Sequence, residues 1–408
     1  RRLYYDSIQG VTALREQVAR LLLDSGCHIG ADQLLITTGC QEAISAGLRA
    51  VCQPGDIVAV DSPCFHGTMQ TLKGLDIKAL EIPTDPQLGL SLDALELLLN
   101  EKRLNAVIAM PTVQNPLGCT MPLAAKKRLA RLMNDHQVPL IEDGLYAEIQ
   151  FGGALSPAVK AFDRDGWVLF CSSFTKTLAP DFRVGWICGG RFHEALRKLK
   201  AVSSMSESQL LSETLATFLE SGGYDHHLRN LRKRYAAQVD EARALIARHF
   251  PRGTLATQPA GGFVFWVEFP PGVDSVALFH QLLEEQICLT PGTLYSPSGR
   301  YRNALRLSCC YPFNARYTQA LARLGAKVHV VDIAKANADA VAAEIVAAGG
   351  SAAAYRVDVS KPAGVEKLAD QVFAADGRVD VLFNNAGIGL QGPIEMTSLE
   401  EWRKIIDV

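Results

Sequence analysis

The chain has 408 residues, of which 48% are hydrophobic and 21% are charged, and its formal net charge is −2. These values fit a globular chain with a large core, and they exclude a general electrostatic attraction to nucleic acid or to an anionic membrane. No apolar stretch approaches the roughly 20 residues that span a bilayer, and the 10 cysteines form neither a CxxC pair nor a zinc-like cluster. We therefore expect a cytoplasmic protein with reduced thiols, no bound metal and no membrane contact.

The two ends of the chain favour a truncated polypeptide. Residue 1 is Arg rather than Met, and no signal peptide follows it. The residues before Val408 stop inside an apparent helix that has no cap. We expect that both ends are cut.

The first part of the chain alternates short apolar strands with amphipathic helices. Helical periodicity marks residues 11–23, and further helices are predicted at 92–100 and 124–135. Strands are predicted at residues 57–60, 77–82, 106–110, 138–141 and 168–171. This alternation predicts an α/β domain in which a mostly parallel sheet is covered by helices on both faces. Residues 210–250 are almost wholly helical, and strands return at 262–269 and 304–308, which predicts a smaller α+β domain.

Polar residues follow several of the predicted strands. Asn115 lies after the strand at 106–110, Asp143 and Tyr146 after the strand at 138–141, and Lys176 after the strand at 168–171. The segment Gly39, Cys40 and Gln41 precedes a helix that begins near residue 42. Since ligands bind beyond the carboxyl ends of the strands in open parallel sheets, these residues predict one shared site.

The residue types at these places suit pyridoxal 5′-phosphate (PLP). This cofactor needs an amine that holds its aldehyde as a Schiff base, which Lys176 supplies, and an anion beside its ring nitrogen, which Asp143 supplies. Asn115 and Tyr146 can donate to its phenolate oxygen. A helix that begins after glycine can bind its phosphate together with hydroxyls and an arginine. The residues predicted for the phosphate are Gly39, Cys40, Gln41, Ser173, Thr175 and Arg183.

Three motifs carry a family resemblance: SFTKTLAPDFRVG around Lys176, DSPCFHG around Phe65, and IEDGLYAEI around Asp143. Residues 3–324 resemble fold-type-I PLP-dependent aminotransferases. They are most similar to the aminotransferase-like domain of MocR-type (GntR-family) regulators, and also to 2-aminoadipate and kynurenine aminotransferases. The resemblance implies a fold-type-I PLP transferase with a large and a smaller domain.

The resemblance implies further roles. Phe65 would stack on the pyridine ring, and Arg306 in ALRLSCC would pair with the substrate carboxylate beside Asn115. Tyr5 would reach the phosphate bound by a neighbouring subunit, so that the active site belongs to a homodimer. The sequence departs from the family at Cys40, where Ser or Ala is commoner, which leaves a side-chain contact to the phosphate in doubt.

Other interpretations of these residues stay open. Asp143 could cap a helix, Phe65 could serve packing alone, and Arg306 could pair with a structural carboxylate. The basic run Arg229, Arg232, Lys233 and Arg234 could bind nucleic acid, although its spacing is more typical of a solvated helix face.

Residues 327–408 resemble an internal fragment of a short-chain dehydrogenase/reductase. Asp332 lies where an acid would bind the ribose of NAD, Asp358 lies near the adenine position, and the NNAG motif covers Asn384 to Gly387. The glycine-rich phosphate loop is absent before residue 327, and no tyrosine follows the NNAG motif. We therefore expect a partial Rossmann-like fragment that neither binds NAD nor has dehydrogenase activity. A join at ALARLGA, residues 320–326, favours a chimeric reading frame.

These patterns divide the chain into an aminotransferase part, residues 1–322, and the fragment 323–408. Within the first part we expect a large domain at about 30–205, and a small domain at about 206–322 that includes the N-terminal segment. Three functions are compatible: amino-group transfer between an amino acid and a 2-oxo acid, with Lys176, Asp143 and Tyr146 as catalytic residues; sensing of PLP or an amino compound in a transcriptional regulator; or PLP binding without turnover. DNA would be bound only through a winged-helix domain that this chain does not contain.

Overall fold

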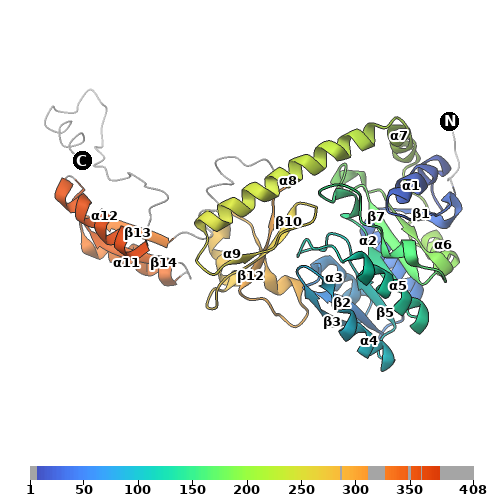
Figure 1. The fold of residues 1–408 in the computed structure, drawn as a ribbon, viewed down its shortest axis with the longest axis horizontal. Coiled ribbons are helices and arrows are strands. Elements are labelled where there is room, and N and C mark those ends of the chain that lie inside the picture. Colours follow the sequence, from blue (N-terminus) through green and yellow to red (C-terminus); the bar gives the residue numbers. More distant parts are fainter. Residues whose placement is uncertain (1–6, 285–286, 311–326, 348–350, 360, 377–408) are drawn as a thin grey trace. The chain divides into compact units, whose positions relative to one another are not determined.

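The computed structural model describes residues 7–284, 287–310, 327–347, 351–359 and 361–376. Tyr5 and the segment Asn384–Gly387 lie outside the described residues. The chain forms two compact units (Figure 1). The first contains residues 1–244, 253–271 and 289–313, and the second contains residues 245–252, 272–288 and 314–408.

The first unit is built around an eight-stranded sheet with the order β1-β8-β7-β6-β5-β2-β3-β4. Strands β7, β6, β5, β2 and β3 are parallel to one another. Strand β8 is antiparallel to both β7 and β1, and β4 is antiparallel to β3. The strands are β1 (Leu34–Thr37), β2 (Ile57–Ser62), β3 (Lys78–Asp85), β4 (Gly89–Leu90), β5 (Ala106–Ala109), β6 (Leu140–Asp143), β7 (Val168–Ser173) and β8 (Gly185–Cys188).

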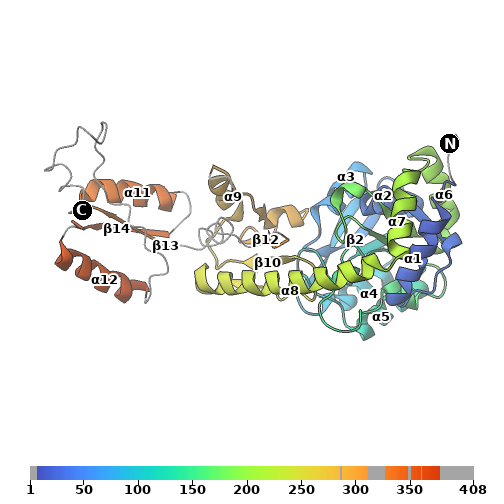
Figure 2. The same cartoon turned by 90° about the horizontal axis from the view of Figure 1, so that it is seen from above.

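Helices cover both faces of this sheet (Figures 1 and 2). On one face, Val60, Ile141 and Leu169 pack with residues of α2 (Cys40–Val51) and α3 (His66–Gly74), and α6 (His193–Val202) contributes Leu196. On the other face, Val107 and Leu140 pack with α4 (Leu92–Asn100) and α5 (Leu123–His136). Further along that face, Phe170 and Trp186 pack with α1 (Thr12–Asp24) and α7 (Gln209–Glu220). The central strands β5, β6 and β7 are buried along their whole length, as a parallel sheet covered on both faces requires, whereas β3 is partly exposed.

Most predicted elements are confirmed, and two bounds agree to the residue: α4 at 92–100 and the strand at 304–308. Strand β6 begins two residues later than predicted and includes Asp143, which therefore ends the strand and does not follow it. The prediction missed β1 and β8. Both have only four residues, LLIT and GWIC, too few to show a period, and both are held by long-range pairing with other strands.

A second, antiparallel sheet has the order β11-β12-β10-β9. Its strands are β9 (Leu255–Ala256), β10 (Val264–Glu268), β11 (Thr290–Pro291) and β12 (Ala304–Ser308). Its link to the large sheet is a set of backbone hydrogen bonds just before β10, where Ala260 N donates to Gly118 O at 2.8 Å and Gly262 N donates to Ile149 O at 2.8 Å. These bonds bring β10 and β12 to the carboxyl ends of β5 and β6.

The remaining helices are α8 (Gly223–His249) and α9 (Ser275–Glu284), and short 3-10 helices occur at Ala31–Gln33, Ala147–Ile149, Val159–Phe162, Pro180–Phe182, Gly190–Phe192 and Gly292–Tyr295. The predicted helical region 210–250 is thus confirmed as α7 and α8.

The described part of the tail has its own βαβα arrangement. Strands β13 (Lys327–Asp332) and β14 (Ser351–Arg356) are parallel, with α11 (Lys335–Ala347) between them and α12 (Pro362–Asp376) after them. Asp332 Oδ1 accepts a 2.7 Å hydrogen bond from Ala334 N at the start of α11. This bond closes a local turn just before α11, which begins at Lys335.

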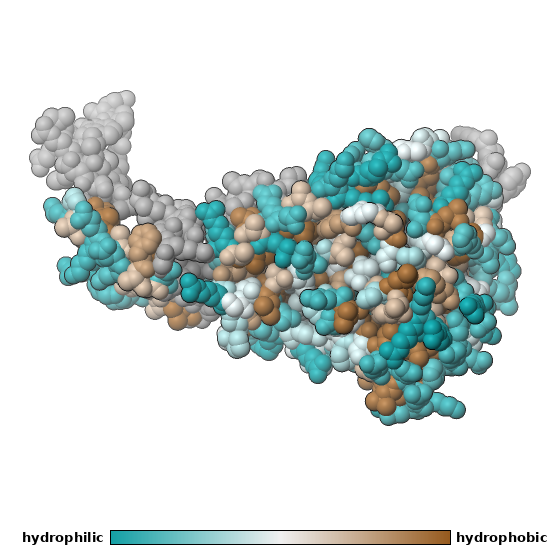
Figure 3. Space-filling view, in the orientation of Figure 1, coloured by the Kyte–Doolittle hydropathy of each residue, from teal (hydrophilic) through white to brown (hydrophobic). Residues whose placement is uncertain are grey.

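The surface of the molecule is mixed in character. On the face that Figure 3 shows, exposed hydrophobic residues are scattered among hydrophilic ones and do not form one large patch. Among the residues that the structure describes, no helix combines the length and the apolar character needed to cross a bilayer.

Candidate active site

The carboxyl ends of β6 and β7 place the central residues of the site. Asp143 ends β6 and is paired in register with Cys171 of the neighbouring β7. Lys176 lies in the turn that follows β7, after Ser173, the last residue of that strand. The two residues thus come from adjacent parallel strands that end at one edge of the sheet.

Asp143 is a buried carboxylate, with 5% of its surface exposed. Its Oδ1 accepts hydrogen bonds from Leu145 N at 3.0 Å and from Cys40 Sγ at 3.5 Å. Burial raises the pKa of Asp143 to about 6, although both hydrogen bonds act in the opposite direction. Above that pH the group is a buried anion, and no cation of the described part of the chain pairs with it. A protonated ring nitrogen would complete this environment.

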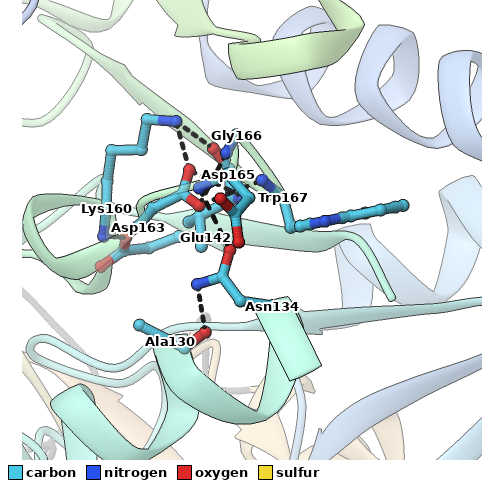
Figure 4. Close-up of polar contacts among 9 residues, drawn as sticks. Ala130, Asn134, Glu142, Lys160, Asp163, Asp165, Gly166 and Trp167 are labelled. Atoms are coloured by element: carbon cyan, nitrogen blue, oxygen red, sulfur yellow. Dashed lines mark hydrogen bonds and ion pairs between the residues drawn. The ribbon is translucent and has the colours of Figure 1, made fainter. Parts of the chain in front are cut away.

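The preceding residue, Glu142, points to the opposite face of the sheet. Its two carboxylate oxygens accept hydrogen bonds of 2.8 Å from Val159 N and Lys160 N, and thereby fix a 3-10 helix. Beside it, Lys160 Nζ lies 2.7 Å from Asp163 Oδ2 (Figure 4). All of these polar groups are occupied, so we assign Glu142 to structure and Asp143 to the site.

Lys176 has no hydrogen bond or ion pair among the described residues. Burial lowers its pKa, and so does the positive charge of Arg306, with a smaller effect from Arg183 in the same direction. Lys176 Nζ lies 6.0 Å from the centroid of the Phe263 ring. A half-buried amine with a lowered pKa is suited to act as a nucleophile.

Arg306 on β12 enters the site from the second sheet. Its Nε is buried without a hydrogen-bond partner, and its guanidinium carbon lies 5.8 Å from the centroid of the Tyr295 ring. Its positive charge, together with burial, lowers the pKa of His66. No described carboxylate pairs with Arg306. The interpretation as half of a structural ion pair therefore gains no support, and the guanidinium is available for an incoming anion.

Asn115 and Tyr146 are both buried. Asn115 Oδ1 has no hydrogen-bond partner, and Asn115 is 4% exposed. Tyr146 is 2% exposed, its ring lies edge-on to Phe263 at 5.4 Å, and burial raises the pKa of its hydroxyl. The positive charge of Arg306 lowers that pKa and the negative charge of Asp143 raises it.

The residues predicted for an anion gather at the first turn of α2. Gly39 precedes this helix with a φ of 83°, and a Cβ placed there would lie 2.7 Å from Arg183 Nη2. Arg183 Nη2 also donates to Thr38 O at 3.3 Å. Ser173 is buried, its Oγ accepts a 3.3 Å hydrogen bond from Thr175 N, and Thr175 Oγ1 is buried without a partner. The Arg183 guanidinium thus lies beside the first turn of α2, and the hydroxyls of Ser173 and Thr175 lie at the end of β7 and just after it.

The side chains of two predicted anion ligands are directed elsewhere. Cys40 Sγ contacts Asp143, and Gln41 Nε2 donates to Thr71 Oγ1 at 2.5 Å and to Gly67 O at 3.3 Å. Their backbone N–H groups at the start of α2 remain suitable for an anion. Phe65 is half-buried just before α3, and its ring centroid lies 4.5 Å from that of His66, on the side of the site near Arg306.

Sequence reasoning missed several aromatic residues of this site. Phe263 contacts both Lys176 and Tyr146, Tyr295 lies beside Arg306, and Tyr224 contacts the turn that carries Lys176. The aromatic run GGFVFWVEF and the PGTLY segment were available as signals, but aromatic residues near strands are more often packing residues. Among the described residues, no cluster of acidic, histidine or cysteine side chains could hold a metal ion.

Comparison with known families gives two matches along the chain. Residues 1–324 match the family described as aminotransferase class I and II. Residues 313–408 match the short chain dehydrogenase family.

Individual relatives and solved structures match the first of these regions. An uncharacterized HTH-type transcriptional regulator of Escherichia coli, YjiR, is 41% identical over 80% of this chain and 69% of its own length. A 2-aminoadipate transaminase of Thermus thermophilus is 29% identical over 79% of this chain and 81% of its own length. The crystal structure of LysN, an α-aminoadipate aminotransferase of Thermus thermophilus complexed with N-(5′-phosphopyridoxyl)-L-leucine, covers 79% of this chain and 82% of its own, with a TM-score of 0.74 and 28% identity.

Proposed function

Because this chain belongs to the aminotransferase class I and II family, we propose that its first 324 residues bind PLP and transfer an amino group between an amino acid and a 2-oxo acid. The observation that carries the proposal is the meeting of Lys176, an amine without a polar partner, with the buried carboxylate Asp143 at the ends of two adjacent strands. The family is PLP-dependent, and LysN, of the same fold, was solved with a phosphopyridoxyl compound.

The residues of the site suit this cofactor. Three buried polar atoms lack hydrogen-bond partners: Asn115 Oδ1, Thr175 Oγ1 and Arg306 Nε. The absence of a Cβ at Gly39 keeps open the space between the start of α2 and Arg183, where a side chain would collide with the guanidinium. A bound phosphate could accept from Thr175 Oγ1 and a substrate carboxylate from Arg306 Nε, whereas Asn115 Oδ1 can only accept and would need a donor on the bound molecule.

Each residue then has a role. Gly39, Ser173, Thr175 and Arg183 would bind the phosphate, with the backbone of Cys40 and Gln41; Asp143 would hold the ring nitrogen; Asn115 and Tyr146 would donate to the phenolate oxygen; and Phe65 would stack on the ring. Tyr5 of a neighbouring subunit would complete the phosphate site of a homodimer, as the family resemblance implies.

When bound, PLP supplies the carbonyl group that receives the amino group and a ring that stabilises negative charge at the α-carbon of the substrate. Arg306 would bind the substrate carboxylate with its planar guanidinium and orient the α-carbon, with Asn115 beside it. The Lys176 amine, whose lowered pKa favours its neutral form, would hold the cofactor between turnovers and would take up and return the α-proton at Nζ during turnover. Phe263 and Tyr146 would shield Lys176 from water.

A titration of the purified protein with PLP tests the binding part of this proposal. We expect a visible absorption band from lysine-linked PLP in the wild type and none in Lys176→Ala, whereas Lys160→Ala keeps the band because Lys160 contacts Asp163 on the far side of the sheet. A wild-type protein without the band would contradict the proposal.

Half-reactions test the transfer part. The loaded protein is mixed with one amino acid at a time, without an oxo acid, and the 2-oxo acid that is released is measured. About one equivalent per site is expected with at least one amino acid of the panel.

A second candidate function is a regulatory sensor. It is favoured by the 41% identity to an HTH-type transcriptional regulator. If PLP binds with the expected band but no amino acid of the panel yields an oxo acid, the sensor function, or binding without turnover, replaces the enzymatic one.

For the tail, we propose that it has no dehydrogenase activity and does not bind NAD, in spite of Asp332, because the sequence before residue 327 has no glycine-rich loop and no tyrosine follows the NNAG motif. Titration with NADH, followed by nicotinamide fluorescence, checks this, and saturable binding would contradict it.

A further inference from the structure

The first turns of α8 hold the turn that carries Lys176. The Tyr224 hydroxyl lies 2.9 Å from Thr177 Oγ1 and 2.9 Å from Glu148 Oε2. A phenol has one hydrogen, so when Tyr224 donates to Glu148 the Thr177 hydroxyl donates to Tyr224. Tyr224 thus connects the residue after Lys176 with a residue that follows Tyr146.

His227, one turn further along α8, binds the backbone of the same residue. Its Nε2 lies 2.6 Å from Thr177 O. A carbonyl oxygen can only accept, so Nε2 carries the hydrogen in this contact. Thr177 is therefore held through its hydroxyl by Tyr224 and through its carbonyl by His227.

The contact between α8 and this turn is dry and well packed. Tyr224 and Thr177 are each 1% exposed, and Leu228 on the same helix face is 4% exposed. The Tyr224 ring also lies edge-on to Phe174 at 5.5 Å. Phe174 and Thr177 flank Lys176 in the chain, so α8 contacts the turn on both sides of the lysine.

This arrangement matters because Lys176 has no polar partner among the residues that the structure describes. Its half-buried position beside the cationic Arg306 is unfavourable for an ammonium group, and a free turn would relax so that Lys176 reaches water. The backbone of the turn must therefore supply the restraint. Before Lys176, Phe174 N donates to Val184 O at 3.0 Å; after it, the described hydrogen bonds from outside the turn link Thr177 to Tyr224 and His227.

We propose that Tyr224 and His227 are positioning residues that hold Lys176 in the site through Thr177. This inference depends on the proposed function in one respect, namely that Lys176 is the amine that binds PLP. It does not need the cofactor to be present, because the restraint belongs to the protein alone.

The test measures the reactivity of the Lys176 amine in the cofactor-free, full-length protein. Competitive labelling with an amine-specific reagent across a pH series, followed by peptide mass spectrometry, reports the fraction of neutral amine at Lys176. Tyr224→Phe keeps the ring and its packing against Phe174 but removes the hydroxyl. We expect the labelling of Lys176 at neutral pH to fall about threefold or more, because a lysine that reaches water regains its ordinary pKa.

Three further variants make the result specific. His227→Leu removes only the bond to Thr177 O and should act in the same direction. Thr177→Ser keeps both contacts and should label like the wild type. The matched control is Tyr301→Phe, which also removes one hydroxyl, 2.9 Å from Ser62 Oγ, and should leave Lys176 labelling unchanged.

A purely structural role for Tyr224 predicts another pattern. The melting temperatures of Tyr224→Phe and Tyr301→Phe would fall, and Lys176 labelling would stay at the wild-type level in both; that pattern overturns the proposal. If Tyr224→Phe does not fold, His227→Leu decides alone by the same criterion.

A second readout uses the loaded protein. Tyr224→Phe should lower kcat severalfold while the KM for the amino donor stays within about twofold, because Thr177 and Tyr224 do not bind substrate. If the wild type gives no visible band with PLP, the proposed function fails, whereas the labelling result still decides whether Tyr224 and His227 position Lys176.

Discussion

Cys40 Sγ donates a 3.5 Å hydrogen bond to Asp143 Oδ1, and both residues are buried. The contact joins the first turn of α2 to the end of β6. The Cys40 side chain therefore does not point to the predicted phosphate position. It instead contacts Asp143, the carboxylate that would hold the ring nitrogen of PLP.

This contact leads to a prediction about pH. The cofactor requires ionised Asp143, so PLP affinity should fall as the pH drops through the pKa of Asp143, which burial raises to about 6. Cys40→Ala removes a hydrogen bond that favours the ionised form, and should move this fall to higher pH. Cys40→Ser supplies a stronger donor and should move it to lower pH. Fluorescence titrations with PLP between pH 5 and 8 measure the midpoints, and equal midpoints in all three proteins would contradict the prediction.

Asp143 itself should contribute strongly to PLP binding. Asp143→Asn replaces a charge-assisted hydrogen bond with a neutral one, which costs roughly 1.5–3 kcal/mol, or about tenfold to a hundredfold in Kd. The neighbouring Glu142→Gln is the control, since Glu142 accepts hydrogen bonds from Val159 N and Lys160 N on the other face. It should lower the melting temperature and leave the Kd for PLP nearly unchanged. Equal losses of affinity in both variants would count against the assignment.

Gly39 should tolerate no side chain. Gly39→Ala combines a φ of 83° with a Cβ only 2.7 Å from Arg183 Nη2, so the guanidinium must move. Gly55→Ala is a matched control, because Gly55 has a φ of 91° and open space around its Cβ position. Both variants should lose roughly 1–2 kcal/mol of stability from backbone strain. Only Gly39→Ala should also weaken PLP binding. An equal effect of the two substitutions on the Kd for PLP would show that the phosphate site is not at Gly39.

Arg306 should determine the affinity for substrates that carry a carboxylate. Arg306→Lys keeps the charge but loses the planar fork, and should raise the KM for an amino acid about tenfold or more. An amine that lacks the carboxylate serves as the internal control. Its weak reaction should change little between wild type and variant, and a parallel loss with both substrates would indicate a general disturbance of the site.

Glu148 should make stability depend on pH. Burial raises its pKa from 4.5 to about 7, so the folded protein binds more protons here than the unfolded one between these values. The associated stability is present below pH 4.5 and is lost as the pH rises through 7. The melting temperature of Glu148→Gln relative to wild type should therefore increase from pH 5 to pH 8. A difference that stays constant over this range would contradict the raised pKa.

The sequence was informative where function or periodicity is local. The helix at 92–100 is fully periodic, and the motif around Lys176 carries its hydroxyls and Arg183 within one short segment. In contrast, three aromatic residues are distant from Lys176 in the sequence and contact the site only because their elements pack against it in the folded chain: Phe263, Tyr295 and Tyr224. These placements depend on tertiary packing, which no short window of sequence encodes. The same reason explains why the antiparallel strand β8 was missed.

The pleat of β6 has a consequence for how this chain can evolve. Ile141 packs on the α2 side of the sheet and Leu140 on the α4 and α5 side, so the two consecutive acids after them are separated by the backbone itself. Inserting or deleting a single codon within this strand would swap the acids: Glu142 would face the pyridine position and Asp143 the peptide groups of residues 159 and 160. Both acids would remain in the chain, yet each would stand in the other's surroundings. Natural insertions and deletions should therefore occur only in the connections before and after β6, where they do not change the face of the sheet to which Glu142 and Asp143 point.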